Sequence, residues 1–207
     1  MVIPGFMDGR KDTYAAQNKP SAKRRMLASF AGTVPDDGAL AGSGLTNQHP
    51  RSRLVQLAKK YPPEVLSAHS GRTPQYAQLL TDARFCLVPR GLSPWTLRMY
   101  ETFFAGCVPV IISDAIRLPF QEFIDYSRVS IKWPEARIGD ELIEYLKSIP
   151  VVEVEAMRRR GGAVRCLFAY QAAEDECNAF SATMWALSLK RRSLAGGGGL
   201  WTNGTVH

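Results

Sequence analysis

The stretch from Phe85 to Asp114, FCLVPRGLSPWTLRMYETFFAGCVPVIISD, restricts the fold more than any other part of this chain. It predicts a strand over 84–89, a loop with an arginine and a glycine, an apolar helix, and a second strand over 108–112. The second strand is continuous and β-branched, which is typical of a parallel sheet covered by helices on both faces. Ser93 is predicted to cap the helix and Gly106 to end it.

The same alternation of strands and helices is predicted along most of the chain. Strands are expected at 26–31, 64–68, 84–89, 108–112 and 129–133, and helices at 51–60, from Thr73-Pro74 onward, at 93–105 and at 138–149. This order predicts an α/β fold, a Rossmann-like doubly wound parallel sheet. The expected parts are a linker or loop over 1–25, the Rossmann-like domain over 26–150, C-terminal helices over 151–193 broken at Gly161-Gly162, and a disordered tail over 194–207.

The net charge of +7 comes largely from three basic runs, Lys23–Arg25, Arg158–Arg160 and Lys190–Arg192. Such runs are usually solvated faces. A basic nucleic-acid-binding protein is an alternative, but aromatic residues do not interleave with the runs and no zinc-finger spacing is present, so we expect no nucleic-acid partner. A basic domain also suits an anionic small molecule or an acidic polysaccharide.

The cysteines and histidines give no sign of a metal site. The four cysteines form no C-x-x-C pair, and His49, His69 and His207 are scattered. Cys86 and Cys107 lie in apolar runs, where a free cysteine behaves as a small hydrophobe. We therefore expect buried thiols and no metal.

The predicted loop after the strand at 84–89 has the features of an anion site. In doubly wound sheets, ligands bind outside the carboxyl ends of the strands, near helix N-termini. Gly91 lets the backbone approach a phosphate closely, Arg90 adds a charged donor, and Ser93 begins the helix. The chain has no G-x-G-x-x-G motif and no P-loop lysine, so neither a nicotinamide site nor a P-loop is supported.

The helix that follows carries an arginine and a glutamate on a narrow polar stripe, formed by Arg98, Glu101, Thr102 and Ala105. The Glu101 carboxylate could accept the two hydroxyls of a ribose, and Arg98 could hold that carboxylate or a phosphate. The structural alternative is a surface ion pair between residues i and i+3, which stabilises a helix by only a few tenths of a kcal/mol.

Several segments match one known family in sequence and spacing. They are Phe85–Gly91, Arg98, Glu101, Ala105–Asp114, Leu118–Phe120 and Ile124–Tyr126, with Val2–Pro4, Leu27–Gly32 and Arg51 upstream. Over roughly residues 1–150 the chain resembles the exostosin family of glycosyltransferases, the sugar-nucleotide-dependent enzymes of heparan sulfate and plant wall polysaccharide synthesis. The run from Phe85 to Phe120 is long enough to be far more specific than a short motif.

The resemblance implies the C-terminal, donor-binding half of a GT-B glycosyltransferase, which places its active site between two facing Rossmann-like domains. It implies that Gly32 lines the diphosphate, Arg51 and Arg90 face phosphate, Arg98 supports the site and Glu101 holds the ribose. The implied donor is a nucleoside diphosphate sugar, most simply a UDP-sugar, with a glycan acceptor, no metal or other cofactor, and a place in the Golgi membrane or lumen.

Other residues of this region are assigned no role in the chemistry. The catalytic base is expected in an opposing domain that the chain does not contain upstream of Val2, so no catalytic residue is assigned. Asp114 could touch the donor sugar or simply end a strand, and Asp125 and Glu135 are expected to be surface acids. The alternative from another class is a non-catalytic nucleotide-sugar-binding protein that works with a homologous partner subunit.

Overall fold

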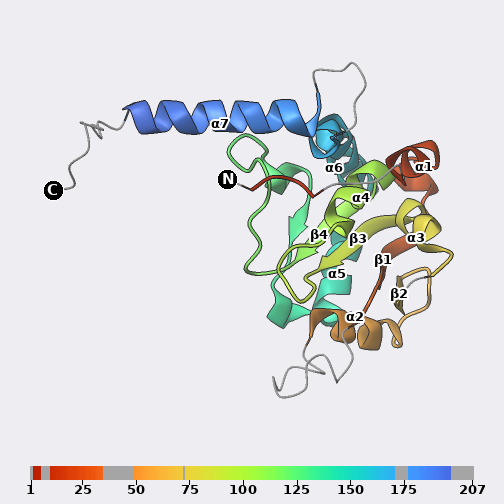
Figure 1. Cartoon of the computed structure of the whole chain (residues 1–207). Helices are drawn as coiled ribbons and strands as arrows, with labels where there is room; N and C mark the ends of the chain where they lie inside the picture. The colour runs from red at the N-terminus through yellow and green to blue at the C-terminus, as the bar shows by residue number, and fades with distance from the viewer. Residues whose placement is uncertain (1, 6–9, 35–48, 72, 171–176, 197–207) are drawn as a thin grey trace.

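The computed structural model describes residues 2–5, 10–34, 49–71, 73–170 and 177–196 (Figure 1). Its centre is a sheet of five parallel strands in the order β2-β1-β3-β4-β5, which confirms the predicted doubly wound fold. The strands are β1 (Met26–Gly32), β2 (Leu66–Ser70), β3 (Ala83–Pro89), β4 (Val108–Ile112) and β5 (Ile131–Lys132). The predicted loop at 35–50 lies mostly outside the described residues.

Helices connect and flank these strands. The α-helices are α1 (Arg10–Ala16), α2 (Pro50–Ala58), α3 (Tyr76–Asp82), α4 (Arg98–Ala105), α5 (Asp140–Ser148), α6 (Val151–Val164) and α7 (Ala179–Gly196). Short 3-10 helices are η1 (Ser21–Lys23), η2 (Tyr126–Arg128), η3 (Glu135–Arg137) and η4 (Arg165–Phe168). In Figure 1, α7 extends away from the body that contains the sheet. Within the described part of the chain, no helix combines the length and apolarity needed to cross a membrane.

Alternation along β3 divides the core into two layers. Cys86 and Val88 face a cluster that includes side chains of α1, α3 and α4, whereas Phe85 and Leu87 face a cluster that includes side chains of α2, α5 and α6. Both faces of a central strand must be apolar when helices cover both, and this explains the uninterrupted apolar runs in the sequence.

The strand order creates a switch point at the carboxyl ends of β1 and β3. The chain moves from β1 to β2 on one side and then returns to place β3 on the other side of β1. The connections leave the sheet in opposite directions at this point, so a crevice opens there that is the usual ligand position in doubly wound sheets. Gly32 ends β1 and Arg90 follows β3 at this crevice.

Helix α4 begins at Arg98, so the predicted start at Ser93 is wrong. The residue before the helix, Leu97, makes no side-chain cap. Tertiary contacts hold the loop in a non-helical path, because Gly91 N–H donates to Ser93 O (3.0 Å) and Ser113 Oγ donates to Pro94 O (3.1 Å). Gly106 does end the helix, with a left-handed φ of 67°, as predicted.

Two further helix predictions need correction. Helix α3 begins at Tyr76 and not at Thr73-Pro74 as predicted. The Thr73 hydroxyl accepts a hydrogen bond from the Gln75 N–H, ahead of the helix. Helix α6 runs through Gly161-Gly162 without a break. A Cβ on Gly161 would lie 3.1 Å from the Phe103 ring, so this glycine permits close packing of α6 on α4 and does not end the helix.

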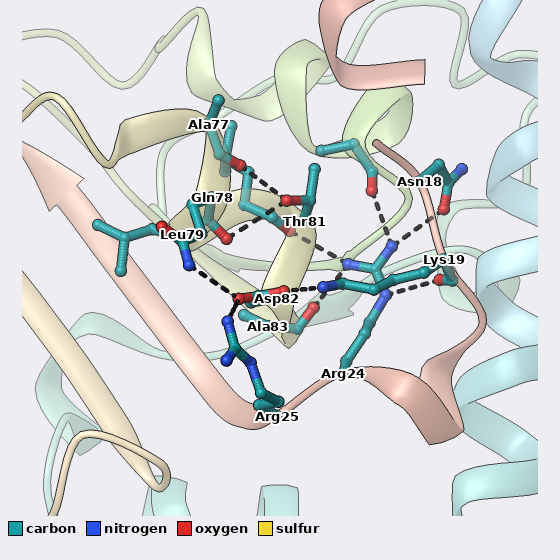
Figure 2. A network of polar contacts seen from close by, with 12 residues as sticks. Asn18, Lys19, Arg24, Arg25, Ala77, Gln78, Leu79, Thr81, Asp82 and Ala83 are labelled. Atoms are coloured by element: carbon teal, nitrogen blue, oxygen red, sulfur yellow. Dashed lines mark hydrogen bonds and ion pairs between the residues drawn. The ribbon is translucent and has the colours of Figure 1, made fainter. Parts of the chain in front are cut away.

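Residues 8–25, expected to be a loop, contain helix α1 and a buried arginine. Tyr14 of α1 is only 2% exposed, so this segment belongs to the core. Figure 2 shows the Arg24 guanidinium reaching between separate elements. It donates hydrogen bonds to five acceptors, which are Lys19 O, Leu80 O, Ala83 O, Ala105 O and Asn18 Oδ1. Burial lowers the Arg24 pKa to about 10, assisted by the nearby charge of Arg158.

The basic runs are partly neutralised within the fold. Lys19 and Arg25 both pair with the carboxylate of Asp82, as Figure 2 shows. In α6, Arg158 and Arg159 pair with Glu155. The prediction of solvated basic faces is therefore wrong for Arg24, and the other ion pairs reduce the free positive surface.

The four cysteines form two disulfides, so the prediction of free buried thiols at Cys86 and Cys107 is wrong. Cys86 bonds to Cys107 with a Cα–Cα distance of 5.7 Å, and Cys166 bonds to Cys177 at 5.6 Å. The first pairing follows from strand register, because Phe85 pairs with Val108 and so brings the adjacent Cys86 and Cys107 together. Sequence spacing alone does not reveal such a contact.

Candidate functional site

A cavity of about 760 Å³ lies at the switch point, between the carboxyl end of β1 and helices α1, α3 and α4. Four of the seven predicted site residues line it, namely Gly32, Arg51, Arg98 and Glu101. Other lining residues include Tyr14, Thr33, Gly71, Tyr76 and Leu97. The remaining predicted residues, Arg90, Gly91 and Ser93, belong to the loop after β3 and do not line the cavity.

Glu101 is held by two tyrosines from elsewhere in the chain. Its Oε1 atom accepts a hydrogen bond from Tyr14 Oη of α1 (3.2 Å), and its Oε2 atom accepts one from Tyr76 Oη of α3. Burial raises the pKa of Tyr76 to about 12, so its hydroxyl remains a neutral donor near neutral pH. The carboxylate is therefore fixed in the cavity wall, and the alternative of a surface ion pair does not hold because Glu101 is 3% exposed.

The Arg98 side chain supports the cavity wall by donating hydrogen bonds to backbone carbonyls of β1 and β3. Its guanidinium donates to Leu87 O (2.9 Å), Ala31 O (3.1 Å) and Ser29 O (3.2 Å), at the carboxyl ends of β3 and β1. The group also lies 5.5 Å from the Phe30 ring centre and 5.4 Å from that of Tyr76. These contacts explain why an apolar helix carries a buried arginine, and they place a positive charge in the cavity wall.

Arg51 links the cavity to the loop after β3. It extends from α2 and donates from Nη1 to Thr33 O (2.6 Å) and from Nε to Arg90 O (3.0 Å). A Cβ on Gly91 would lie 3.1 Å from Arg51 Nη2, so glycine allows this close approach. Burial lowers the Arg51 pKa, with a smaller contribution from the charge of Arg98.

His49 positions Arg51 and was not predicted as a site residue. Its Nδ1 atom accepts a hydrogen bond from Arg51 N–H (3.2 Å) at the start of α2, which places the ring proton on Nε2, 3.2 Å from Gly91 O. Burial lowers the His49 pKa, and the charges of Arg90 and Arg51 lower it further. The neutral ring therefore joins α2 to the loop after β3.

Arg90 points toward the carboxyl ends of β4 and β5. Its Nε donates to Glu135 Oε2 (2.8 Å), and Glu135 Oε1 accepts from Asp114 N–H (3.1 Å). Asp114 Oδ1 in turn accepts from Glu135 N–H (3.2 Å). The prediction that Glu135 is a surface acid is wrong, because 19% of its side chain is exposed and it joins three strand ends.

The charge of the cavity suits an anion that also carries hydroxyl groups. Two guanidinium groups, of Arg51 and Arg98, line the same space as the carboxylate of Glu101. The arginines favour phosphate, and the carboxylate can accept hydroxyl protons. Within the described ranges, no three His, Cys, Asp or Glu side chains gather in a group that could hold a metal ion.

Tyr14 and Tyr76, like His49, are site residues that sequence reasoning missed. Tyr14 lies in the segment expected to be a linker, and Tyr76 was assigned only to the apolar face of a helix. No motif marks them, because their relation to Glu101 depends on how α1 and α3 pack beside α4.

Comparison with known proteins identifies relatives of the whole region. The Exostosin GT47 domain matches residues 3–149. The chain is 36% identical to exostosin-2 of Bos taurus over 163 residues, covering 76% of this chain and 23% of that protein. It is 31% identical to a probable glucuronosyltransferase of Oryza sativa subsp. japonica over 159 residues, covering 77% of this chain and 37% of that protein.

A solved structure gives a partial likeness. The crystal structure of WaaG, a glycosyltransferase involved in lipopolysaccharide biosynthesis, superposes with a TM-score of 0.44 at 13% identity, over 89% of this chain and 55% of that one. The chain spans 23% of exostosin-2 of Bos taurus and 37% of the rice relative. With a family match over most of its length, the chain belongs to the exostosin family of glycosyltransferases.

Proposed function

We propose that this chain is the donor-binding domain of an exostosin-type glycosyltransferase of GT-B architecture, and that its cavity binds the nucleoside diphosphate of a sugar donor. One observation carries the proposal. The cavity at the switch point brings together the guanidinium groups of Arg51 and Arg98 and a carboxylate, Glu101, held by two tyrosine hydroxyls. Phosphate and ribose need this combination of donors and acceptors.

Each part of the donor has a proposed partner. Glu101 accepts the ribose hydroxyls, while Arg51 and the backbone at Gly32 face the diphosphate. Arg98 contributes mainly its charge, because each of its three nitrogens already donates to a β-strand carbonyl. Arg90, Gly91 and Ser93 lie beside the cavity, where we place the distal phosphate and the start of the sugar.

The arginines perform the electrostatic work in this proposal. When the glycosidic bond to the donor breaks, negative charge develops on the leaving diphosphate. Fixed positive groups in a partly dehydrated site stabilise that charge without a metal ion. The general base that activates the acceptor is assigned to no residue of this chain.

Family membership supports a proposal for the donor, the acceptor and the compartment. We propose a UDP-sugar donor, a polysaccharide or glycoprotein glycan as acceptor, and a homologous subunit as partner. The transferred sugar is proposed to be a hexosyl, glycuronosyl or pentosyl unit, and the name of the rice relative, a probable glucuronosyltransferase, supports the glycuronosyl option. The two disulfides support an oxidising compartment such as the Golgi lumen, because disulfides persist where thiols are not kept reduced.

Calorimetric titration with UDP, GDP and uridine tests the proposal. We expect a nucleoside diphosphate to bind, and Arg51→Ala to reduce affinity for UDP much more than affinity for uridine. Arg159→Ala is the matched control, since its side chain is 75% exposed on α6 and is not among the residues that line the cavity. An equal loss for UDP and uridine would remove Arg51 from the phosphate site. Absence of nucleotide binding, together with a steeply salt-dependent affinity for DNA or RNA, would replace the proposal.

A further inference from the structure

An ion pair joins the ends of three neighbouring strands beside the cavity. Arg90 follows β3, Asp114 lies just beyond β4, and Glu135 begins η3 after β5. The Arg90–Glu135 contact is 2.8 Å long, with 25% of the arginine side chain and 19% of the glutamate side chain exposed. The Glu135 carboxylate is thus paired with the Arg90 guanidinium, the group that the proposed function assigns to the distal phosphate of the donor.

The two partners of this ion pair are held unequally. The Glu135 carboxylate has a second contact, because its Oε1 accepts from Asp114 N–H (3.1 Å). The backbone of Glu135 is also held, since its N–H donates to Asp114 Oδ1 and its carbonyl accepts from Arg53 Nη1 (2.8 Å). Besides Glu135, the guanidinium of Arg90 has only a long contact from Nη1 to Gly91 O (3.3 Å) among the described residues. Arg90 is therefore the partner that can move.

Arg90 also lies next to the cavity through its backbone. Its carbonyl accepts a hydrogen bond from Arg51 Nε, and Arg51 lines the cavity. Its N–H donates to Ile112 O (2.9 Å), which fixes the start of the side chain between β3 and β4. Rotation about the side-chain bonds of Arg90 would turn the guanidinium from Glu135 toward the Arg51 side without moving the backbone.

We propose that Glu135 is an internal competitor for Arg90, and that a diphosphate gains this guanidinium only by displacing or sharing the Glu135 carboxylate. The inference rests on the proposed function, because that function supplies the competing anion. Two effects act in the same direction. Binding must weaken an existing ion pair, and the fixed negative charge of Glu135 repels an incoming phosphate. Glu135 thereby sets how weakly the diphosphate is held and how readily it leaves.

Replacing Glu135 with glutamine removes the charge and keeps the length of the side chain. The glutamine oxygen can still accept the Asp114 N–H, so the loop after β4 retains its contact. A partly exposed ion pair of this kind corresponds to about 1 kcal/mol, which is about fivefold in affinity. We therefore expect Glu135→Gln to tighten UDP and inorganic pyrophosphate about fivefold and to leave uridine unchanged.

The experiment is calorimetric titration of the full chain with UDP, pyrophosphate and uridine. The variants are Glu135→Gln, Arg90→Ala and the double variant, with melting temperatures recorded for each. Glu141→Gln is the matched control, because Glu141 also pairs with an arginine but is 55% exposed on α5. Competition through Arg90 predicts that the tightening by Glu135→Gln disappears in the Arg90→Ala background.

The outcomes separate this inference from the proposed function. Unchanged or weaker diphosphate binding by Glu135→Gln overturns the competitor role and makes Glu135 a support for Arg90. Tightening that persists without Arg90 also overturns it, because it reflects only a general charge effect. UDP could fail to bind while Glu135→Gln raises the affinity for pyrophosphate only when Arg90 is present. That result would support the competitor role of Glu135 and overturn the proposed nucleotide binding. Failure of every variant to bind either anion overturns both.

Discussion

Substitution of Glu101 with glutamine tests the centre of the proposed site. Glu101 accepts hydrogen bonds from Tyr14 and Tyr76 and is 3% exposed. Hydrogen bonds to a charged group contribute about 1.5–3 kcal/mol each. Glutamine has one acceptor oxygen, so it keeps one tyrosine donor and presents its NH₂ group to the other, whose hydroxyl must turn to accept. We expect a loss of about 1–2 kcal/mol in the free energy of unfolding.

The same change should also weaken nucleotide binding, in addition to lowering the stability of the fold. For a chain of this length, the stability loss corresponds to roughly 2–8 °C in melting temperature. Loss of the charged acceptor for the ribose should cost about 1–3 kcal/mol, or roughly 5- to 150-fold in UDP affinity. The assay combines scanning calorimetry with titration of UDP and 2′-deoxy-UDP, and the deoxy ligand should lose less affinity. A folded Glu101→Gln protein that binds UDP like the parent would refute the ribose assignment.

Four further outcomes are expected. Arg98→Met should lower the free energy of unfolding by about 3–5 kcal/mol in urea titration, because three strand carbonyls lose a buried charged donor, whereas Arg159→Met should change it by less than about 0.5 kcal/mol. Because burial lowers the His49 pKa, the folded protein holds the ring in its neutral form. Its contribution to stability is complete above the unfolded pKa of 6.5 and is lost as the pH falls through the lower pKa of the folded state. His49→Asn should therefore reduce the difference in urea midpoint between pH 7.5 and pH 5.5. Reduction of the two disulfides should lower the melting temperature, as measured by scanning calorimetry of the reduced and the oxidised protein. The 207-residue polypeptide should bind UDP but transfer sugar to oligosaccharides slowly. No cavity residue is assigned as the general base, and the lack of a positioned base costs about 10²–10⁴-fold in rate; rapid turnover would contradict this.

Local signals explain which parts of the fold could be predicted. The apolar run of β4 and the glycine at 106 depend on short-range geometry, and both were placed correctly. The start of α4 was misplaced because the loop is held by Ser113, the residue just beyond β4. A capping pattern cannot register a competing contact from elsewhere in the fold.

The candidate site follows the same division. Gly32 and Arg51 were identified through family resemblance, and Arg98 and Glu101 through the polar stripe of the helix as well. The fold brings all four to one cavity. The disulfide pairing, the tyrosines around Glu101 and the partners of Glu135 all depend on strand order and helix packing. Sequence spacing does not encode those distances, so these features required the three-dimensional arrangement.

The contacts of Arg24 also limit how far the N-terminal part of this domain can be shortened before it no longer folds. Its guanidinium meets carbonyls in the last turn of α3 and just beyond it, at Leu80 and Ala83, and at Ala105, the last residue of α4. One side chain thus caps the negative ends of two helices that lie far apart in sequence. A shortened protein that starts at β1 would leave both helix ends unsatisfied and expose Glu101 by removing Tyr14. The smallest unit that folds and retains the cavity should therefore start ahead of α1.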